Sequence, residues 1–147
     1  MVPVTVPATV EWVNTGVNVR AGQSVTIAAT GAWTPGPLET FDPNGSMMEW
    51  PDNFLNRADI GACNFCATTA TEHWAALIGY IGNAPPPAGS YTSTSVLSEA
   101  QKVFFVGRIF QGSALQSGTL WLNFNDDAYS NITSDNSGQV MAAIIVV

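Results

Sequence analysis

The fold is constrained most by a series of short apolar or alternating runs that glycines and prolines separate. Residues 10–13 and 17–20 alternate apolar and polar side chains, as half-buried strands do, and Asn14-Thr15-Gly16 has the chemistry of a turn between them. Further strands are predicted over 24–30, 75–81, 103–107, 118–125 and 139–147. Seven or more short strands predict an all-β fold, a jelly-roll-like β-sandwich of two antiparallel sheets.

The composition is that of a folded chain with few charges. Of its 147 residues, 46% are hydrophobic and 10% are charged, so we expect a single domain over residues 1–147. A net charge of -7 with four basic residues leaves no basic patch, which argues against nucleic acid or an anionic membrane surface as a partner. No apolar run reaches the roughly 18 residues of a membrane span, so we expect no membrane insertion.

The cellular location is suggested by composition. Low lysine, together with many Thr, Ser, Gly and Asn residues, is common in extracellular β proteins, so we expect a secreted or extracellular protein. The first residues do not have the pattern of a signal peptide. Leaderless export, or excision from a longer chain, would reconcile these two observations.

The two cysteines and the single histidine give little support to redox, zinc or catalytic chemistry. Cys63 and Cys66 have the spacing of a redox or zinc motif, but a structural zinc site needs four ligands and only His73 lies nearby. A thioredoxin-like site would need a βαβ context. We favour a local disulfide or two free thiols, and we predict no enzyme activity.

A polar loop over 125–138 lies between two apolar runs. It concentrates carboxylates, amides and hydroxyls, which are the hard oxygen ligands that calcium prefers. Its spacing does not match an EF-hand. Composition alone leaves two interpretations open, a calcium site or an ordinary polar hairpin.

The order of several short motifs favours the calcium interpretation. The chain resembles the PA-IL (LecA) family of calcium-dependent, galactose-binding bacterial lectins, and this resemblance covers most of its length. The motifs that carry it are Ala21-Gly22-Gln23-Ser24-Val25-Thr26-Ile27, Gly31-Ala32-Trp33-Thr34-Pro35-Gly36-Pro37, Asp42-Pro43-Asn44-Gly45, Trp50-Pro51-Asp52-Asn53, Ala76-Leu77-Ile78-Gly79-Tyr80-Ile81-Gly82-Asn83, Asn125-Asp126 and Asp135-Asn136-Ser137-Gly138.

The resemblance implies a Ca2+ site. Carried onto this chain, the ligands are the side chains of Asp126, Asp135 and Asn136, the carbonyl of Pro35 and a carbonyl of either Ser130 or Ile132. The family usually has an amide where this chain has Asp135, so the extra negative charge predicts tighter calcium binding. The longer spacing between Asp126 and Asp135 leaves the choice between Ser130 and Ile132 open.

The resemblance also implies a sugar site, in which calcium bridges two adjacent hydroxyls of a galactose-like saccharide. On the loop formed by Trp50, Pro51 and Asn53, the family commonly has histidine and glutamine at the first and last positions. Trp50 can stack on a pyranose, or it can be a core or interface aromatic. Asp126 and Asp135 are expected to contact the sugar as well, and Asp127 either accepts a hydrogen bond there or is solvated.

These expectations describe a calcium-dependent, carbohydrate-binding lectin that is not an enzyme. The family implies a homo-oligomer, a dimer or tetramer, since single sugar sites are commonly weak and gain from avidity. Two alternatives remain: a calcium-stabilised structural or adhesive module without a sugar site, and a carbohydrate-binding accessory domain of a larger enzyme.

Overall fold

The computed structural model describes residues 1–36, 39–46, 75–85, 103–125 and 136–147. All regular structure in these residues is β. The strands are β1 (Val2–Pro7), β2 (Val13–Val19), β3 (Ser24–Thr34), β4 (Leu77–Gly82), β5 (Phe104–Phe105), β6 (Ile109–Ser113), β7 (Gly118–Phe124) and β8 (Ser137–Val146). Within the described part of the chain, no helix has the length and apolar character needed to span a membrane.

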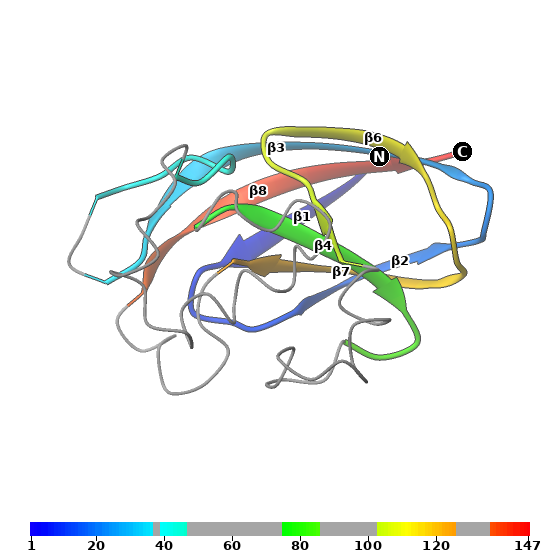
Figure 1. The fold of residues 1–147 in the computed structure, drawn as a ribbon, viewed down its shortest axis with the longest axis horizontal. Helices are drawn as coiled ribbons and strands as arrows, with labels where there is room; N and C mark the ends of the chain where they lie inside the picture. Colours follow the sequence, from blue (N-terminus) through cyan, green and yellow to red (C-terminus); the bar gives the residue numbers. More distant parts are fainter. Residues whose placement is uncertain (37–38, 47–74, 86–102, 126–135) are drawn as a thin grey trace, which may run out of the picture.

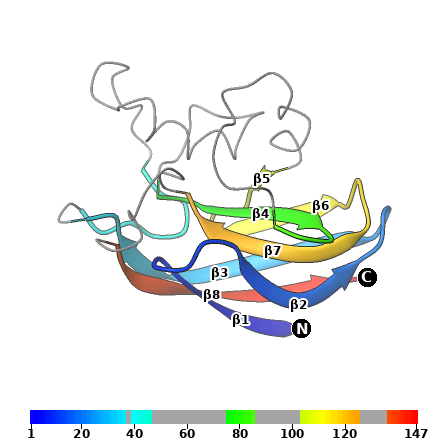
Figure 2. The same cartoon turned by 90° about the horizontal axis from the view of Figure 1, so that it is seen from below.

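The strands form two four-stranded antiparallel sheets that face each other (Figures 1 and 2). The first sheet has the order β1-β8-β3-β6, and the second has the order β2-β7-β4-β5. The longest strand pairing in the first sheet is that of β3 with β8. It extends from the pair Val25 and Val146 to the pair Thr34 and Ser137. The predicted all-β sandwich of antiparallel sheets is therefore confirmed.

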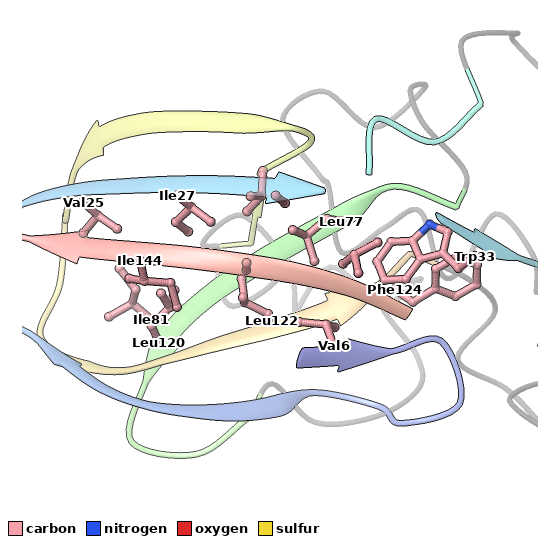
Figure 3. Close-up of a cluster of buried hydrophobic side chains, with 14 of the residues drawn as sticks. Val6, Val25, Ile27, Trp33, Leu77, Ile81, Leu120, Leu122, Phe124 and Ile144 are labelled. Atoms are coloured by element: carbon pink, nitrogen blue, oxygen red, sulfur yellow. The ribbon is translucent and has the colours of Figure 1, made fainter. Parts of the chain in front are cut away.

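The core lies between the sheets and is built by alternation along the strands. Ile27 and Ile144 come from the first sheet, and Leu77, Leu120 and Leu122 come from the second; all five are at most 1% exposed. Figure 3 shows these side chains gathered between the two layers. Burying each such side chain contributes about 1.5–3 kcal/mol relative to leaving it in water, which makes this layer the main source of stability.

The prediction of two strands joined by a turn at Asn14-Thr15-Gly16 is wrong. One strand, β2, runs through this segment, and its register against β7 shifts between Asn14 and Asn18, so the segment is a bulge. Thr15 Oγ1 donates to the Leu120 carbonyl at 2.6 Å and accepts from the Val17 amide at 3.1 Å. Gly16 has a φ of +71°. Polar residues typical of turns are used here to satisfy the irregular backbone of a bulge.

Two strands were not predicted. β1 contains Pro3 and Pro7, which usually argue against a strand, but β1 pairs only with β8 and so lies at a sheet edge where proline is tolerated. β6 is a short edge strand that pairs with β3. The predicted strand over 103–107 is reduced to Phe104 and Phe105.

Replacing Thr15 with valine tests the bulge. The side chain is 8% exposed, and losing its hydroxyl would leave the Leu120 carbonyl and the Val17 amide without this partner. We expect the free energy of unfolding to fall by about 1–3 kcal/mol, measured by urea denaturation. Thr119→Val is the control, because its hydroxyl bonds the Asn18 side chain in an exposed position. Equal losses in the two variants would contradict the role given to Thr15.

Candidate functional site

The candidate site lies at the end of the sandwich where β3 finishes and β8 begins. Thr34 and Ser137 are the last paired positions of this ladder. Pro35 follows Thr34 and Asn136 precedes Ser137, so two residues predicted as calcium ligands from distant parts of the sequence come together here. Both are buried.

The position of Asn136 is fixed by the chain that directly follows β1. Its side-chain Nδ2 donates to the Ala8 carbonyl at 3.3 Å, and the Ala8 amide donates to the Gly138 carbonyl at 3.0 Å. These contacts direct the nitrogen of the Asn136 amide towards the chain that follows β1. The amide oxygen, which is the atom a cation would use, lies on the other branch of the same planar group.

Pro35 is positioned by a closed turn of the chain after β3. Trp33 and Phe41 exchange backbone hydrogen bonds of 3.0 and 2.8 Å, and the hydroxyls of Thr34 and Thr40 lie 3.0 Å apart. Gly36 has a φ of +65°, in the left-handed region that glycine adopts without a steric penalty. The backbone at Pro35 is therefore held by the turn as well as by the fixed φ of proline.

The second sheet holds Asn125, the residue that precedes the segment 126–135. Asn125 directly follows β7 and is fully buried. Its amide donates to the Ala76 carbonyl and its carbonyl accepts from the Ala75 amide, both at 2.8 Å. The segment 126–135 thus leaves the second sheet at Asn125 and enters the first sheet at Asn136, and both ends are held in place.

Trp33 connects the end of β3 in the first sheet to the end of β7 in the second sheet. Its indole Nε1–H donates to the Ala75 carbonyl at 2.7 Å, and its ring packs edge-on against Phe124 with centroids 4.5 Å apart. Figure 3 shows the Trp33 and Phe124 rings beside one another at one end of the core. Because the Ala75 amide also donates a hydrogen bond to the Asn125 carbonyl, Trp33 sets the distance between the ends of β3 and β7.

Gly138 lets β8 approach β3 closely beside Asn136. It has a φ of +86°, and a Cβ there would lie 2.6 Å from the Ala32 carbonyl oxygen and 2.8 Å from the Trp33 Cα. These neighbours are backbone atoms of a central strand, which cannot move aside cheaply. Any side chain at this position would push apart the pair of strand ends that carries Pro35 and Asn136.

The structure brings together two of the predicted site residues, Pro35 and Asn136. The remaining ones lie outside the described residues, and so do the two cysteines: Trp50, Pro51, Asn53, Cys63, Cys66, Asp126, Asp127, Ser130, Ile132 and Asp135. No group of three or more His, Cys, Asp or Glu side chains able to hold a metal occurs among the described positions. The predicted carboxylates are not among those positions, so the calcium site stays a prediction.

The tryptophans differ in what they contribute. Trp12 and Trp33 are buried, and Trp121 is half-buried. The role of Trp33 in joining the sheets was not predicted, because it depends on a hydrogen bond to Ala75 that is remote in sequence. Its place just before Thr34 and Pro35 was the one available signal.

Replacing Gly138 with alanine should loosen this end of the sandwich. Gly22→Ala is a closely matched control, because Gly22 has a φ of +87° and no atom within 4 Å of the added Cβ. Both variants bear the cost of a positive φ, and only Gly138→Ala adds the clash. We expect Gly138→Ala to lose about 1–3 kcal/mol more free energy of unfolding than Gly22→Ala, measured by denaturant unfolding. Equal losses would mean that the close approach is not under constraint.

Trp33→Phe removes the hydrogen bond from the indole to the Ala75 carbonyl, which links the two sheets, and keeps an aromatic ring. The Ala75 carbonyl would lose its indole partner in a buried place, and a small void would form. We expect a loss of about 2–4 kcal/mol in the free energy of unfolding. Trp121→Phe is the control, since its indole also donates to a carbonyl, that of Gly82, but at 3.1 Å and in a half-buried position. A Trp33 variant as stable as the Trp121 variant would refute the linking role.

Comparison with known proteins gives one informative result. No protein-family model matches the sequence, and no curated protein matches it either. Among solved structures, the chain is similar to one described as the EclA N-terminal domain, a PllA-like lectin. The TM-score is 0.64 at 22% sequence identity, over 100% of this chain and 97% of that one. The chain therefore shares its fold, over its whole length, with a lectin domain.

Proposed function

We propose that this protein is a calcium-dependent lectin that binds galactose-like saccharides and catalyses no reaction. Two independent lines support carbohydrate binding. The fold matches that of a domain described as a PllA-like lectin, and the order of motifs resembles the PA-IL family. Neither line alone specifies the ligand, so the proposal depends on the geometry at the end of β3 and β8.

The observation that carries the proposal is the meeting of Pro35 and Asn136 at the end of that ladder. A carbonyl oxygen and an amide oxygen are donors of the type that calcium prefers. Both residues are buried and lie beside hydrogen-bonded backbone, which favours a site formed before the ion arrives. The donor chemistry of these two residues therefore fits a calcium ion.

In the proposed site the charge comes from the two carboxylates at either end of the segment 126–135. Asp126 follows the buried Asn125, and Asp135 precedes the buried Asn136, so the fold fixes the residue beside each carboxylate. Two carboxylates would balance the charge of Ca2+. A carbonyl of Ser130 or Ile132 would complete the protein ligands.

The bound sugar would be recognised from two sides. When bound, calcium supplies coordination positions for two adjacent hydroxyls, and Asp126 and Asp135 accept hydrogen bonds from them. On the far side of the sugar, Trp50 and Pro51 would offer an apolar surface, and Asn53 would offer a hydrogen-bonding amide. Asp127 would accept a further hydrogen bond from the sugar. We further propose that the protein acts outside the cell and as a homo-oligomer, in which several weak sites bind together.

A glycan array run with calcium and with a chelator tests the function directly. We expect binding to galactose-terminated glycans in calcium, and loss of that binding with the chelator. Calcium should also raise the thermal unfolding temperature, because the ion binds the folded state and not the unfolded chain. If calcium stabilises the protein but no glycan is bound in either condition, the protein is a calcium-stabilised module and the lectin proposal fails.

Asp135→Asn tests the ligand set. We expect calcium affinity to fall by about tenfold or more, with sugar binding retained at high calcium, measured by calorimetric titration of each ligand. Glu11→Gln is the control, because it removes one exposed acidic charge from outside the proposed ligand set. An unchanged calcium affinity in Asp135→Asn would mean that Asp135 is not a ligand.

A further inference from the structure

Asn44 and Gly45 form the one Asn-Gly pair of the chain. In such a pair the glycine nitrogen can attack the carbon of the asparagine side-chain amide, because glycine has no side chain that hinders the approach. The amide nitrogen then leaves as ammonia, and the asparagine becomes a carboxylate. Whether the pair reacts in the folded protein depends on how the structure holds the attacking nitrogen and the side-chain amide.

The attacking nitrogen is held in a closed turn. Residues 42–45 form a β-turn in which the Gly45 amide donates to the Asp42 carbonyl at 2.9 Å. Pro43 at the second position and glycine at the fourth are typical of such a turn. The Asp42 carboxylate also accepts from the Asn44 amide at 2.7 Å. Gly45 is buried, so its N–H is engaged and shielded from water while the turn is closed.

The side-chain amide of Asn44 is held by a different partner. Its Oδ1 accepts from the Arg108 backbone amide at 2.9 Å. Gly107 has a φ of +61°, and a Cβ there would lie 2.7 Å from the same oxygen, so the chain passes close beside this side chain. The amide carbon of Asn44 can turn towards the Gly45 nitrogen only after the hydrogen bond to Arg108 breaks. Both reacting groups are therefore restrained, and by separate contacts.

These contacts lie where the chain crosses from one sheet to the other. β5 belongs to the second sheet and β6 to the first, and Gly107 and Arg108 lie between them. The Leu77 amide of β4 donates to the Pro43 carbonyl at 2.8 Å, and the Leu77 carbonyl accepts from the Gly107 amide at 3.0 Å. The Arg108 carbonyl accepts from the Ala29 amide of β3 at 2.8 Å. We call residues 42–45 and 106–108 the Asn44 corner; it is bonded to both sheets.

We propose that Asn44 is a deamidation site, and that the reaction requires local opening of the Asn44 corner. In the reaction the Gly45 nitrogen loses its proton and bonds to the Asn44 Cγ, the bond from Cγ to Nδ2 breaks, and ammonia leaves. Water then adds to one of the two carbonyls of the resulting succinimide. Addition at Cγ gives aspartate. Addition at the main-chain carbonyl gives isoaspartate, in which the chain continues through the side-chain carbon.

The isoaspartate product would prevent the corner from closing again. Its main chain contains an additional methylene between positions 44 and 45, so the turn cannot keep both the bond from Gly45 to Asp42 and the bond from Leu77 to Pro43. The product also places a new carboxylate beside Asp42 in a chain that already carries a net charge of -7. Opening of the corner, once followed by this reaction, is irreversible. The proposal does not depend on calcium or sugar binding.

The reaction rate in the folded and unfolded chain tests the restraint. The full chain is incubated in mildly alkaline buffer, with and without guanidinium chloride, and the change from amide to carboxylate at Asn44 is followed by mass spectrometry of the peptide that contains it. Two hydrogen bonds must break before the folded chain reacts, so we expect the unfolded chain to react about tenfold faster or more. Equal rates would overturn the proposal.

Asp42→Ala loosens the turn, and Asp42→Asn is its matched control. Both variants remove the carboxylate charge, but asparagine keeps a side-chain oxygen that can accept from the Asn44 amide. The asparagine placed at 42 cannot react in the same way, because Pro43 has no N–H. We expect Asn44 to deamidate about threefold faster or more in folded Asp42→Ala than in folded Asp42→Asn. Equal rates in these two folded variants would contradict the proposed restraint.

Thr15→Val separates local opening from global unfolding. Thr15 lies in β2, at the opposite edge of the second sheet from β5, and its hydroxyl bonds the Leu120 carbonyl. We expect this variant to lose stability and to deamidate at Asn44 at the rate of the unmodified chain, because the Asn44 corner is unchanged. If Thr15→Val accelerates the reaction as strongly as Asp42→Ala does, the reaction proceeds through global unfolding and the proposal is wrong.

Discussion

The hydrogen bond from the Trp33 indole to the Ala75 carbonyl is the interaction on which this end of the molecule depends. A sandwich is held together mainly by non-directional apolar contact, which permits the sheets to slide or splay at their ends. The bond from Trp33, together with the edge-on packing on Phe124, fixes one sheet against the other. Since Ala75 is bonded to Asn125, both strand ends that flank the segment 126–135 are placed by one side chain.

The candidate site follows from this arrangement and from the strand register. Pro35 and Asn136 meet because β3 and β8 pair up to Thr34 and Ser137, and not because of any local motif. Gly138 makes that pairing close, and the chain after β1 holds the Asn136 amide through Ala8. Two residues held in this way by strand pairing and a hydrogen bond would need little further ordering to bind a ligand.

The sequence predicted the central strands well, because their alternation of apolar and polar residues is a direct consequence of one buried face. The sequence-based prediction failed where the structural role of a residue depends on its position in the sheet. Pro3 and Pro7 are acceptable at an edge strand, and Asn14-Thr15-Gly16 forms a bulge because Thr15 can bond the neighbouring strand. Pro35 and Asn136 were predicted as ligands from motif order and remain predictions, whereas the positioning roles of Trp33 and Ala8 come from contacts remote in sequence.

The absence of charge from all eight described strands has a further consequence. Every charged group of the chain lies outside these strands, so scaffold and chemistry occupy separate parts of the sequence. Substitutions that alter charge in the connections can change which ligand the protein recognises, while the strands of the two sheets keep their pairing register. Related chains with the same strands can therefore differ in ligand preference through substitutions in their connections, with little loss of folding stability.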